Sequence, residues 1–172
     1  ANDSALAEYD VSTGARRVAF LRRFWSQRDR AELLADGERL REHYRRLYYA
    51  KRTFRLVSSN RHYDIVERFR SGSRDYDDRG IIYIRHGEPT RRATYSAPGV
   101  QLNESWMYER ADGNMVFHFL AREDVQDYKL VESLFDVLGF SDALALRGDR
   151  DNTATGRVNE LLLTRDRLDP VY

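Results

Sequence analysis

The residues best suited to chemistry lie together in residues 81–89, which have the sequence Ile-Ile-Tyr-Ile-Arg-His-Gly-Glu-Pro. An imidazole can act as a nucleophile, and a guanidinium can pair with two oxygens of a phosphoryl group. A glycine between them and the next polar residue lets the backbone approach a ligand closely, because it has no Cβ. The residue types in this stretch are therefore compatible with phosphoryl transfer.

If residues 81–84 form a strand, a strand that ends in Arg85-His86-Gly87-Glu88 resembles the signature of the histidine phosphatase (phosphoglycerate mutase-like) superfamily. That resemblance implies His86 as the nucleophile and Arg85 as the phosphate clamp, with Glu88 beside them. The remainder of the chain differs from that superfamily, because the pattern after Pro89 is a strand meander without helix–strand alternation. His118 is the only downstream histidine, and its Phe-His-Phe setting predicts a packed sheet residue.

A simpler interpretation accounts for the same residues. Glycine tolerates positive φ and proline prevents further pairing, so Gly-x-Pro is an ordinary exit from a strand into a turn. In that case His86 has no special role, and Glu88 caps the turn or pairs with an arginine.

Acidic residues just before this stretch could form an oxygen-rich cation site together with Glu88. The alternative is that they pair with the neighbouring Arg74 and Arg79. We expect neither a metal nor a cofactor here. The acidic residues are Asp75, Asp77 and Asp78.

Residues 12–70 are predicted to be mainly helical. Ser12 or Thr13 can cap a first helix, and Asp29 can cap a second, longer one, although Gly37 interrupts its pattern. A short third helix is predicted over residues 63–69. The apolar positions that recur at helical spacing are Val18, Leu21 and Trp25, followed by Leu33, Leu40, Tyr44, Leu47 and Phe54.

From residue 81 the apolar pattern has the period of a strand. Strands are predicted over residues 81–84, 104–108, 115–119 and 128–131, with a hairpin at Asp112-Gly113. We therefore predict an α+β fold in which N-terminal helices pack on a four-stranded antiparallel meander.

The expected domain organisation has three parts. Residues 1–12 form an N-terminal arm, residues 13–133 a single α+β domain, and residues 134–172 a C-terminal extension. Within the extension we predict a helix reaching back to residue 133 and ending at 146, a loop at 148–156, and an apolar anchor at 161–163.

Composition excludes several classes of protein. The 172 residues contain no cysteine, which rules out thiolate catalysis, disulfides and cysteine-bound metal clusters. No apolar run approaches the ~20 residues that span a bilayer. The 29 basic and 28 acidic residues nearly balance, so a nucleic-acid partner is not expected. The basic residues are 27 arginines and 2 lysines, and more than half of them lie in the first 70 residues.

A second resemblance extends over residues 16–133. The motifs that carry it follow one another along the chain. The first two are Phe20 to Asp29, with Phe24-Trp25 and Arg28-Asp29, and the spaced set Glu42, Arg46, Ala50 and Phe54. They are followed by Asp78-Arg79-Gly80 through Gly87-Glu88-Pro89, by Glu104, Trp106 and Tyr108, and by residues 115–120 and 128–133. In this order they resemble the GWxTD domain, a family of bacterial and mostly exported proteins. Where that family has Gly-Trp-x-Thr-Asp, this chain has residues 74–78 and shares only Asp78.

The resemblance implies a fold and a location outside the cytoplasm, such as the periplasm, more than a mechanism. Arginine and tyrosine are enriched at protein–protein interfaces. The candidate partner-binding residues are Arg45, Arg46, Tyr48, Tyr49 and Arg52. A solvated, salt-bridged helix face is the alternative for these residues.

From these observations we expect a non-catalytic binding or scaffolding protein with a protein partner. One such case is an extrinsic subunit that is docked on a membrane protein complex and lacks a transmembrane segment of its own. A histidine-phosphatase-like enzyme that uses Arg85, His86 and Glu88 is the alternative, and an RNA-binding module is the third hypothesis.

Overall fold

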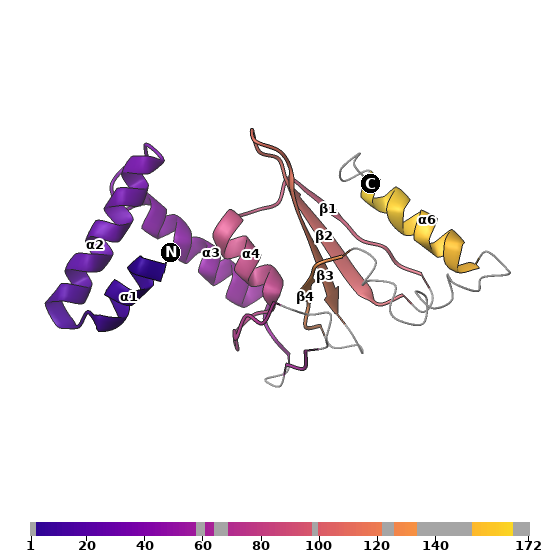
Figure 1. Cartoon of the computed structure of the whole chain (residues 1–172), viewed down its shortest axis with the longest axis horizontal. Coiled ribbons are helices and arrows are strands. Elements are labelled where there is room, and N and C mark those ends of the chain that lie inside the picture. The colour runs from indigo at the N-terminus through magenta and orange to yellow at the C-terminus, as the bar shows by residue number, and fades with distance from the viewer. Residues whose placement is uncertain are drawn as a thin grey trace. The chain divides into compact units, whose positions relative to one another are not determined.

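The structure is a computed structural model, and it describes residues 3–57, 61–63, 69–97, 100–121, 126–133 and 153–166. The chain divides into two compact units, unit 1 (residues 1–48) and unit 2 (residues 49–172). Unit 1 is helical, and unit 2 contains a four-stranded antiparallel sheet with helices (Figure 1). The predicted α+β class, with N-terminal helices ahead of a four-stranded antiparallel sheet, is confirmed.

Unit 1 begins with a helix where the sequence predicted an arm. Helix α1 (Asp3–Val11) is followed by α2 (Gly14–Ala31), and Thr13 occupies the N-cap position of α2 without making a side-chain capping bond. The side chain of Arg17 joins the two helices, because its Nε donates to the carbonyl of Ser12 at 2.7 Å. The rings of Tyr9 and Phe20 also pack together, with 6.0 Å between their centroids.

The second predicted helix starts later than expected, after a turn. Helix α2 ends at Ala31, and α3 (Glu38–Thr53) begins after a turn in which Leu33 and Gly37 have positive φ. Asp29 does cap the following helix, but it does so from inside α2. Its carboxylate accepts hydrogen bonds from the backbone N–H groups of Gly37 and Arg39, each at 2.8 Å. These N–H groups would otherwise be unsatisfied at the start of α3.

The sheet of unit 2 is an antiparallel meander in the order β1-β2-β3-β4. Its strands are β1 (Arg91–Ala93), β2 (Leu102–Tyr108), β3 (Met115–Ala121) and β4 (Lys129–Val131). The hairpin between β2 and β3 turns at Gly113, whose φ of +122° suits glycine. The predicted strands at 104–108, 115–119 and 128–131 therefore correspond to observed strands.

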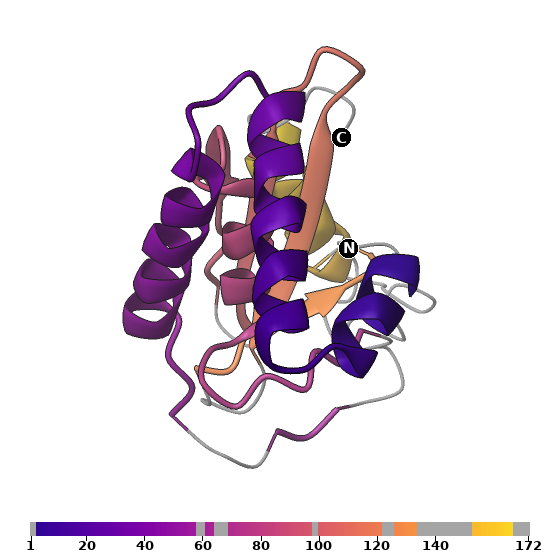
Figure 2. The same ribbon diagram turned by 90° about the vertical axis from the view of Figure 1, so that its left-hand side faces the viewer.

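Both faces of the sheet are covered, because successive side chains of a strand point to opposite faces. Trp106 and Phe119 pack with Phe54 of the segment after α3 and with Ile82 of α4 (Asp78–His86). On the other face, Leu120, Val131 and Tyr95 pack with Leu161 of α6 (Thr153–Asp166). Figures 1 and 2 show the sheet between α4 and α6. The predicted loop at 148–156 is wrong for residues 153–156, which start α6.

The strand predicted over residues 81–84 is wrong, because these residues lie in α4. Two helix-end signals outweigh the β propensity of Ile-Ile-Tyr-Ile. The carboxylate of Asp77 accepts a hydrogen bond from the N–H of Arg79 and caps the first turn. Gly87, at φ +84°, ends the helix. The edge strand of the sheet is instead β1, after Pro89.

Two other predicted helices fall largely outside the described residues. Of the predicted helix at 63–69, only residues 63 and 69 are described, and neither is helical. Of the predicted helix at 133–146, only residue 133 is described.

Candidate functional site

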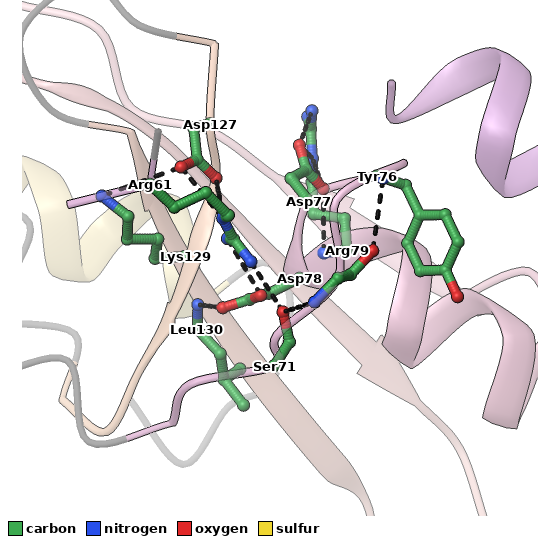
Figure 3. Close-up of polar contacts among 10 residues, drawn as sticks. Arg61, Ser71, Tyr76, Asp77, Asp78, Arg79, Asp127, Lys129 and Leu130 are labelled. Carbon is green, nitrogen blue, oxygen red and sulfur yellow. Dashed lines mark hydrogen bonds and ion pairs between the residues drawn. The ribbon is translucent and has the colours of Figure 1, made fainter. Parts of the chain in front are cut away.

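A buried cluster of charges surrounds the two aspartates that begin α4 (Figure 3). Asp77 is fully buried and forms a bidentate ion pair with Arg79, whose Nη2 lies 2.7 Å from its Oδ2. The other side of the Arg79 guanidinium reaches Glu104 of β2 at 3.0 Å. The same guanidinium stacks over the ring of Tyr128, 3.6 Å from its centroid. Arg79 thus ties the start of α4 to β2 and to the segment before β4.

Asp78 turns toward a second arginine. Its Oδ1 lies 3.0 Å from Nη2 of Arg61, and its Oδ2 accepts a hydrogen bond from the backbone N–H of Leu130 at 2.9 Å. Arg61 also forms a bidentate pair with Asp127, with a shortest distance of 2.7 Å, and donates to Ser71 Oγ at 2.6 Å. Figure 3 shows Arg61 between the two carboxylates. This pairing holds the described part of the 61–71 segment against β4.

Burial acts in opposite directions on the pKa values of the carboxyl groups and of the guanidinium groups in this cluster. Loss of hydration raises the pKa of Asp77 to about 6, although the Arg79 guanidinium opposes this rise. Burial also raises the pKa of Asp78, against the hydrogen bond from Leu130 and the charge of Arg61. For Arg61, burial acts to lower the pKa, but the bond to Asp127 and the nearby carboxylates outweigh it and raise it. The arginines of the cluster thus oppose the effect of burial on both aspartates.

The cluster holds elements of unit 2 together, and the residues that carry the GWxTD resemblance contribute to it or pack beside it. Gly80 lies against Tyr76, where a Cβ would come within 2.5 Å of the Tyr76 ring. Trp106 is fully buried, and the Tyr108 hydroxyl donates to the carbonyl of Gly87 at 3.0 Å. Pro89 is buried as well. These residues position α4 on the sheet, which is a structural role.

The acidic residues considered for a cation site face separate basic partners. Asp75 pairs with Lys51 at 2.8 Å and Glu88 pairs with Arg92 at 2.8 Å, while Asp77 and Asp78 pair with arginines as described above. Within the described ranges, no group of three or more acidic or histidine side chains is arranged to hold a metal ion.

Arg85, His86 and Glu88 lie at the C-terminal end of α4, so the strand-end geometry of the phosphatase hypothesis is absent. The His86 ring packs 5.4 Å from Tyr108 and 5.5 Å from Phe117. His118 points to the other face of the sheet, where its Nδ1 lies 2.7 Å from Ser105 Oγ. The structure therefore does not bring these two histidines into one site.

The predicted partner-binding residues of α3 do not form one exposed surface. Tyr48 is 71% exposed, and Arg45 and Arg52 share its outward face. Arg46 is held by an ion pair with Glu42 and is largely covered. Tyr49 stacks on Tyr83, with 4.4 Å between ring centroids, and so contributes to the packing of unit 2.

An open groove lies on the surface of unit 1. Its volume is about 750 Å³, and it lies among α1, α2 and the first turns of α3. Figure 1 shows α2 and α3 diverging from the turn that joins them. The lining includes Tyr9, Val18, Leu21, Arg22, Trp25, Leu40, His43 and Tyr44. Trp25 packs on His43, with 5.1 Å between their ring centroids, and both residues line the groove.

The groove combines features that sequence reasoning named separately. Val18, Leu21 and Trp25 were predicted as the apolar stripe of one helix, and Leu40 and Tyr44 as the stripe of the next. Helical periodicity alone predicts that such stripes are buried against each other. Here Val18 is 50% and Tyr44 61% exposed, because the two helices diverge.

Sequence reasoning missed a second buried polar network, under α6. Arg165 is fully buried, and its guanidinium donates to Ser105 Oγ at 3.0 Å and to Asn103 Oδ1 at 2.7 Å. Burial, together with the charge of Arg165, lowers the pKa of His118 to about 4. These residues are separated by up to 62 positions, and no local motif connects them.

No family model, curated protein or solved structure matches this chain. The GWxTD resemblance therefore stays a prediction based on the motifs themselves. None of the helices in the described part of the chain has the length and apolar character needed to cross a membrane.

Proposed function

We propose that this chain is a non-catalytic binding or scaffolding protein that acts outside the cytoplasm. An extrinsic subunit docked on a membrane protein complex is the form of this proposal that best fits the motif resemblance. The observation that carries it is the groove of unit 1, where an ordered set of apolar and aromatic side chains remains open to solvent.

The contrast between the two units supports this proposal. Unit 2 buries large apolar side chains on both faces of its sheet, including Trp106, Phe119 and Leu120. In unit 1, Phe20 is the only large apolar side chain among the described residues that is buried. Exposed apolar surface of this kind marks interaction sites in proteins. Unit 2 is thus suited to be a rigid body and unit 1 to be a docking element.

Two independent arguments support the proposed location. The absence of cysteine from all 172 residues is compatible with an oxidising compartment, and the motif resemblance is to a mostly exported family.

Affinity capture of the full chain tests the proposal directly. A tagged chain expressed in its own host is crosslinked, and partners are quantified separately from the membrane and soluble extracytoplasmic fractions. We expect one stoichiometric protein partner. A chain that runs as a lone monomer and retains no stoichiometric partner from either fraction would overturn the proposal.

The two other hypotheses can be tested on the same purified sample. Phosphoryl transfer by His86 predicts phosphate release from an aryl phosphate that is lost in His86→Ala. RNA binding predicts an affinity that falls steeply as salt increases. We expect neither, and a positive result that survives these controls would favour the corresponding alternative.

A further inference from the structure

We propose that α6 is an acid-sensitive cover of the sheet in unit 2, and that protonation of His118 releases it. Release uncovers the apolar face of the sheet that carries Leu120 and Val131. All of the side chains that carry this step belong to unit 2, so the step is independent of the groove in unit 1 and goes beyond the proposed function.

The C-terminal end of α6 is held to β2 by the polar contacts of one side chain. Arg165 is fully buried, and its Nε donates to Ser105 Oγ at 3.0 Å while its Nη2 donates to Asn103 Oδ1 at 2.7 Å. Leu161 lies four residues earlier and packs in the apolar cluster of the same sheet face. One face of α6 therefore carries both an apolar and a charged contact with the sheet.

His118 shares the Ser105 hydroxyl with Arg165. It lies directly across from Ser105 in the β2–β3 pair, and its Nδ1 is 2.7 Å from Ser105 Oγ. A hydroxyl has one hydrogen and two lone pairs. Arg165 donates to one lone pair, and the hydroxyl can donate its hydrogen to Nδ1 of a neutral imidazole. A single oxygen atom thus links the imidazole to the arginine that holds α6.

Protonation of His118 disrupts this arrangement. Nδ1 of an imidazolium carries a hydrogen and cannot accept one, so the Ser105 hydroxyl loses this acceptor. The same oxygen then lies between two cations, His118 and Arg165. His118 is only 7% exposed and Ser105 is fully buried, so little water is available to screen the repulsion.

The other charged groups near this face do not offset the repulsion. On β2, Glu104 follows the opposite face of the sheet, where it pairs with an arginine. On β4, Lys129 shares the face of His118 and is itself a cation. On α6, Glu160 and Asp166 are exposed, and Glu160 already accepts a tyrosine hydroxyl at 2.7 Å. Among the described elements, the charge that acts on His118 is therefore that of Arg165.

Release of α6 relieves this conflict. Burial, and then the charge of Arg165, lower the pKa of His118 from 6.5 to about 4. Because α6 carries Arg165 and packs on the face to which His118 points, its departure removes the charge and admits water. The two strands that carry Ser105 and His118 pair along their whole length, so the sheet can persist while α6 leaves. With an ordinary pKa of 6.5 in the released state, the ratio of released to docked α6 rises roughly 70-fold from pH 7.5 to pH 4.5.

Amide hydrogen exchange of the full chain at pH 7.5 and pH 4.5 tests this prediction. Protection factors divide out the effect of pH on the chemical exchange rate, so they report the opening of each element. We expect α6 to lose protection by about 10- to 70-fold at pH 4.5, whereas β2 and β3 stay protected.

Variants test whether His118 is the group that titrates. His118→Asn keeps a polar side chain near Ser105 but does not titrate, so α6 should keep its protection at pH 4.5. His62→Asn is the matched control, because it makes the same substitution at an exposed histidine of unit 2 and should leave the wild-type loss unchanged. Arg165→Gln removes the facing charge but keeps a donor, so its loss should be smaller than that of the wild type. Urea unfolding at pH 7.5 shows that each variant is folded.

Three results would overturn the inference. The first is unchanged protection of α6 at pH 4.5, and the second is an equal loss of protection in α6 and in the sheet. The third is a loss in His118→Asn as large as that of the wild type. None of these results bears on the proposed function, which is tested by capture of a partner.

Discussion

The carboxylate of Asp29, within α2, accepts a hydrogen bond from the backbone N–H of Arg39 at 2.8 Å and so caps the first turn of α3. Its other oxygen accepts the N–H of Gly37, and the side chain is only 2% exposed. A single residue thereby fixes where the second helix starts and the path of the turn before it. The angle between the two walls of the groove depends on this turn.

Removal of the Asp29 cap should loosen this turn. Asp29→Ala deletes both acceptors and leaves two partly buried N–H groups without partners, so we expect it to cost about 1–2 kcal/mol. Asp29→Asn keeps one acceptor oxygen and should cost less. Amide hydrogen exchange of α3 measures the effect, which should be confined to unit 1. Unchanged exchange at Gly37 and Arg39 in Asp29→Ala would contradict the capping role.

Gly80 and Gly156 should respond in opposite ways to the same substitution. A Cβ at Gly80 would come within 2.5 Å of the Tyr76 ring and within 2.9 Å of its Cγ, so Gly80→Ala should destabilise the fold by about 1–3 kcal/mol. Gly156, in the first turn of α6, has nothing within 4 Å of such a Cβ. Gly156→Ala should therefore stabilise by about 0.5–1 kcal/mol through lower backbone entropy in the unfolded chain. Urea unfolding midpoints of the two variants decide between these outcomes.

His118 should make stability depend on pH. Its pKa is lowered from 6.5 to about 4, so the unfolded chain takes up a proton between these values while the folded chain does not. The contribution of His118 to the free energy of unfolding is full above pH 6.5. It falls by ~3 kcal/mol as the pH drops toward 4 and is constant below that.

His118→Asn provides the comparison for this pH dependence, because Asn keeps a polar atom near Ser105 but does not titrate. The pKa of Asp77 is raised, and Asp77 contributes with the opposite sign over part of the same range. The difference between wild type and His118→Asn in urea unfolding at pH 7 and pH 4.5 therefore isolates His118. Equal pH dependence in the two proteins would show that the imidazole is not held neutral.

The ion pairs of Arg61 and Arg45 should contribute very differently to the free energy of unfolding. Arg61→Ala leaves the buried carboxylates of Asp78 and Asp127 without their guanidinium, and we expect a loss of about 3–5 kcal/mol. Arg45 makes an equally short ion pair with Glu42, but its side chain is 78% exposed. Arg45→Ala should therefore change stability by no more than about 0.5 kcal/mol. Thermal unfolding of both variants at low and high salt provides the test, and comparable losses would show that burial does not strengthen the Arg61 pairs.

Local signals in the sequence were sufficient for β2, β3 and β4 and for most of α2 and α3. Asp112-Gly113 predicted the hairpin, and the alternation around Trp106 and Phe119 predicted its strands. The error at residues 81–84 came from weighing β propensity above the two ends of the segment. Asp77 before the stretch and Gly87 after it are ordinary helix caps, so the signal for α4 was present in the sequence.

The candidate site was less accessible to sequence reasoning, because it depends on the path of the chain between helices. The apolar stripes at Val18, Leu21 and Trp25 and at Leu40 and Tyr44 were visible as helical patterns. Nothing in their spacing shows that the two helices diverge. The buried polar pairs are even harder to predict from the sequence, because Arg61 and Asp127 are 66 positions apart and Arg165 and Asn103 are 62 positions apart. Spacing could have separated Tyr48 from Arg46 on the surface of α3, since they do not share a helix face.

The position of α6 in the chain has a consequence for how the protein is made. One face of the sheet, with Leu120 and Val131, is covered by a helix whose central packing residue is Leu161. During synthesis α6 cannot cover the side chains of this face until Leu161 has left the ribosome, although all four strands are complete by residue 131. In that interval a nascent chain presents an apolar sheet surface of the kind that chaperones recognise.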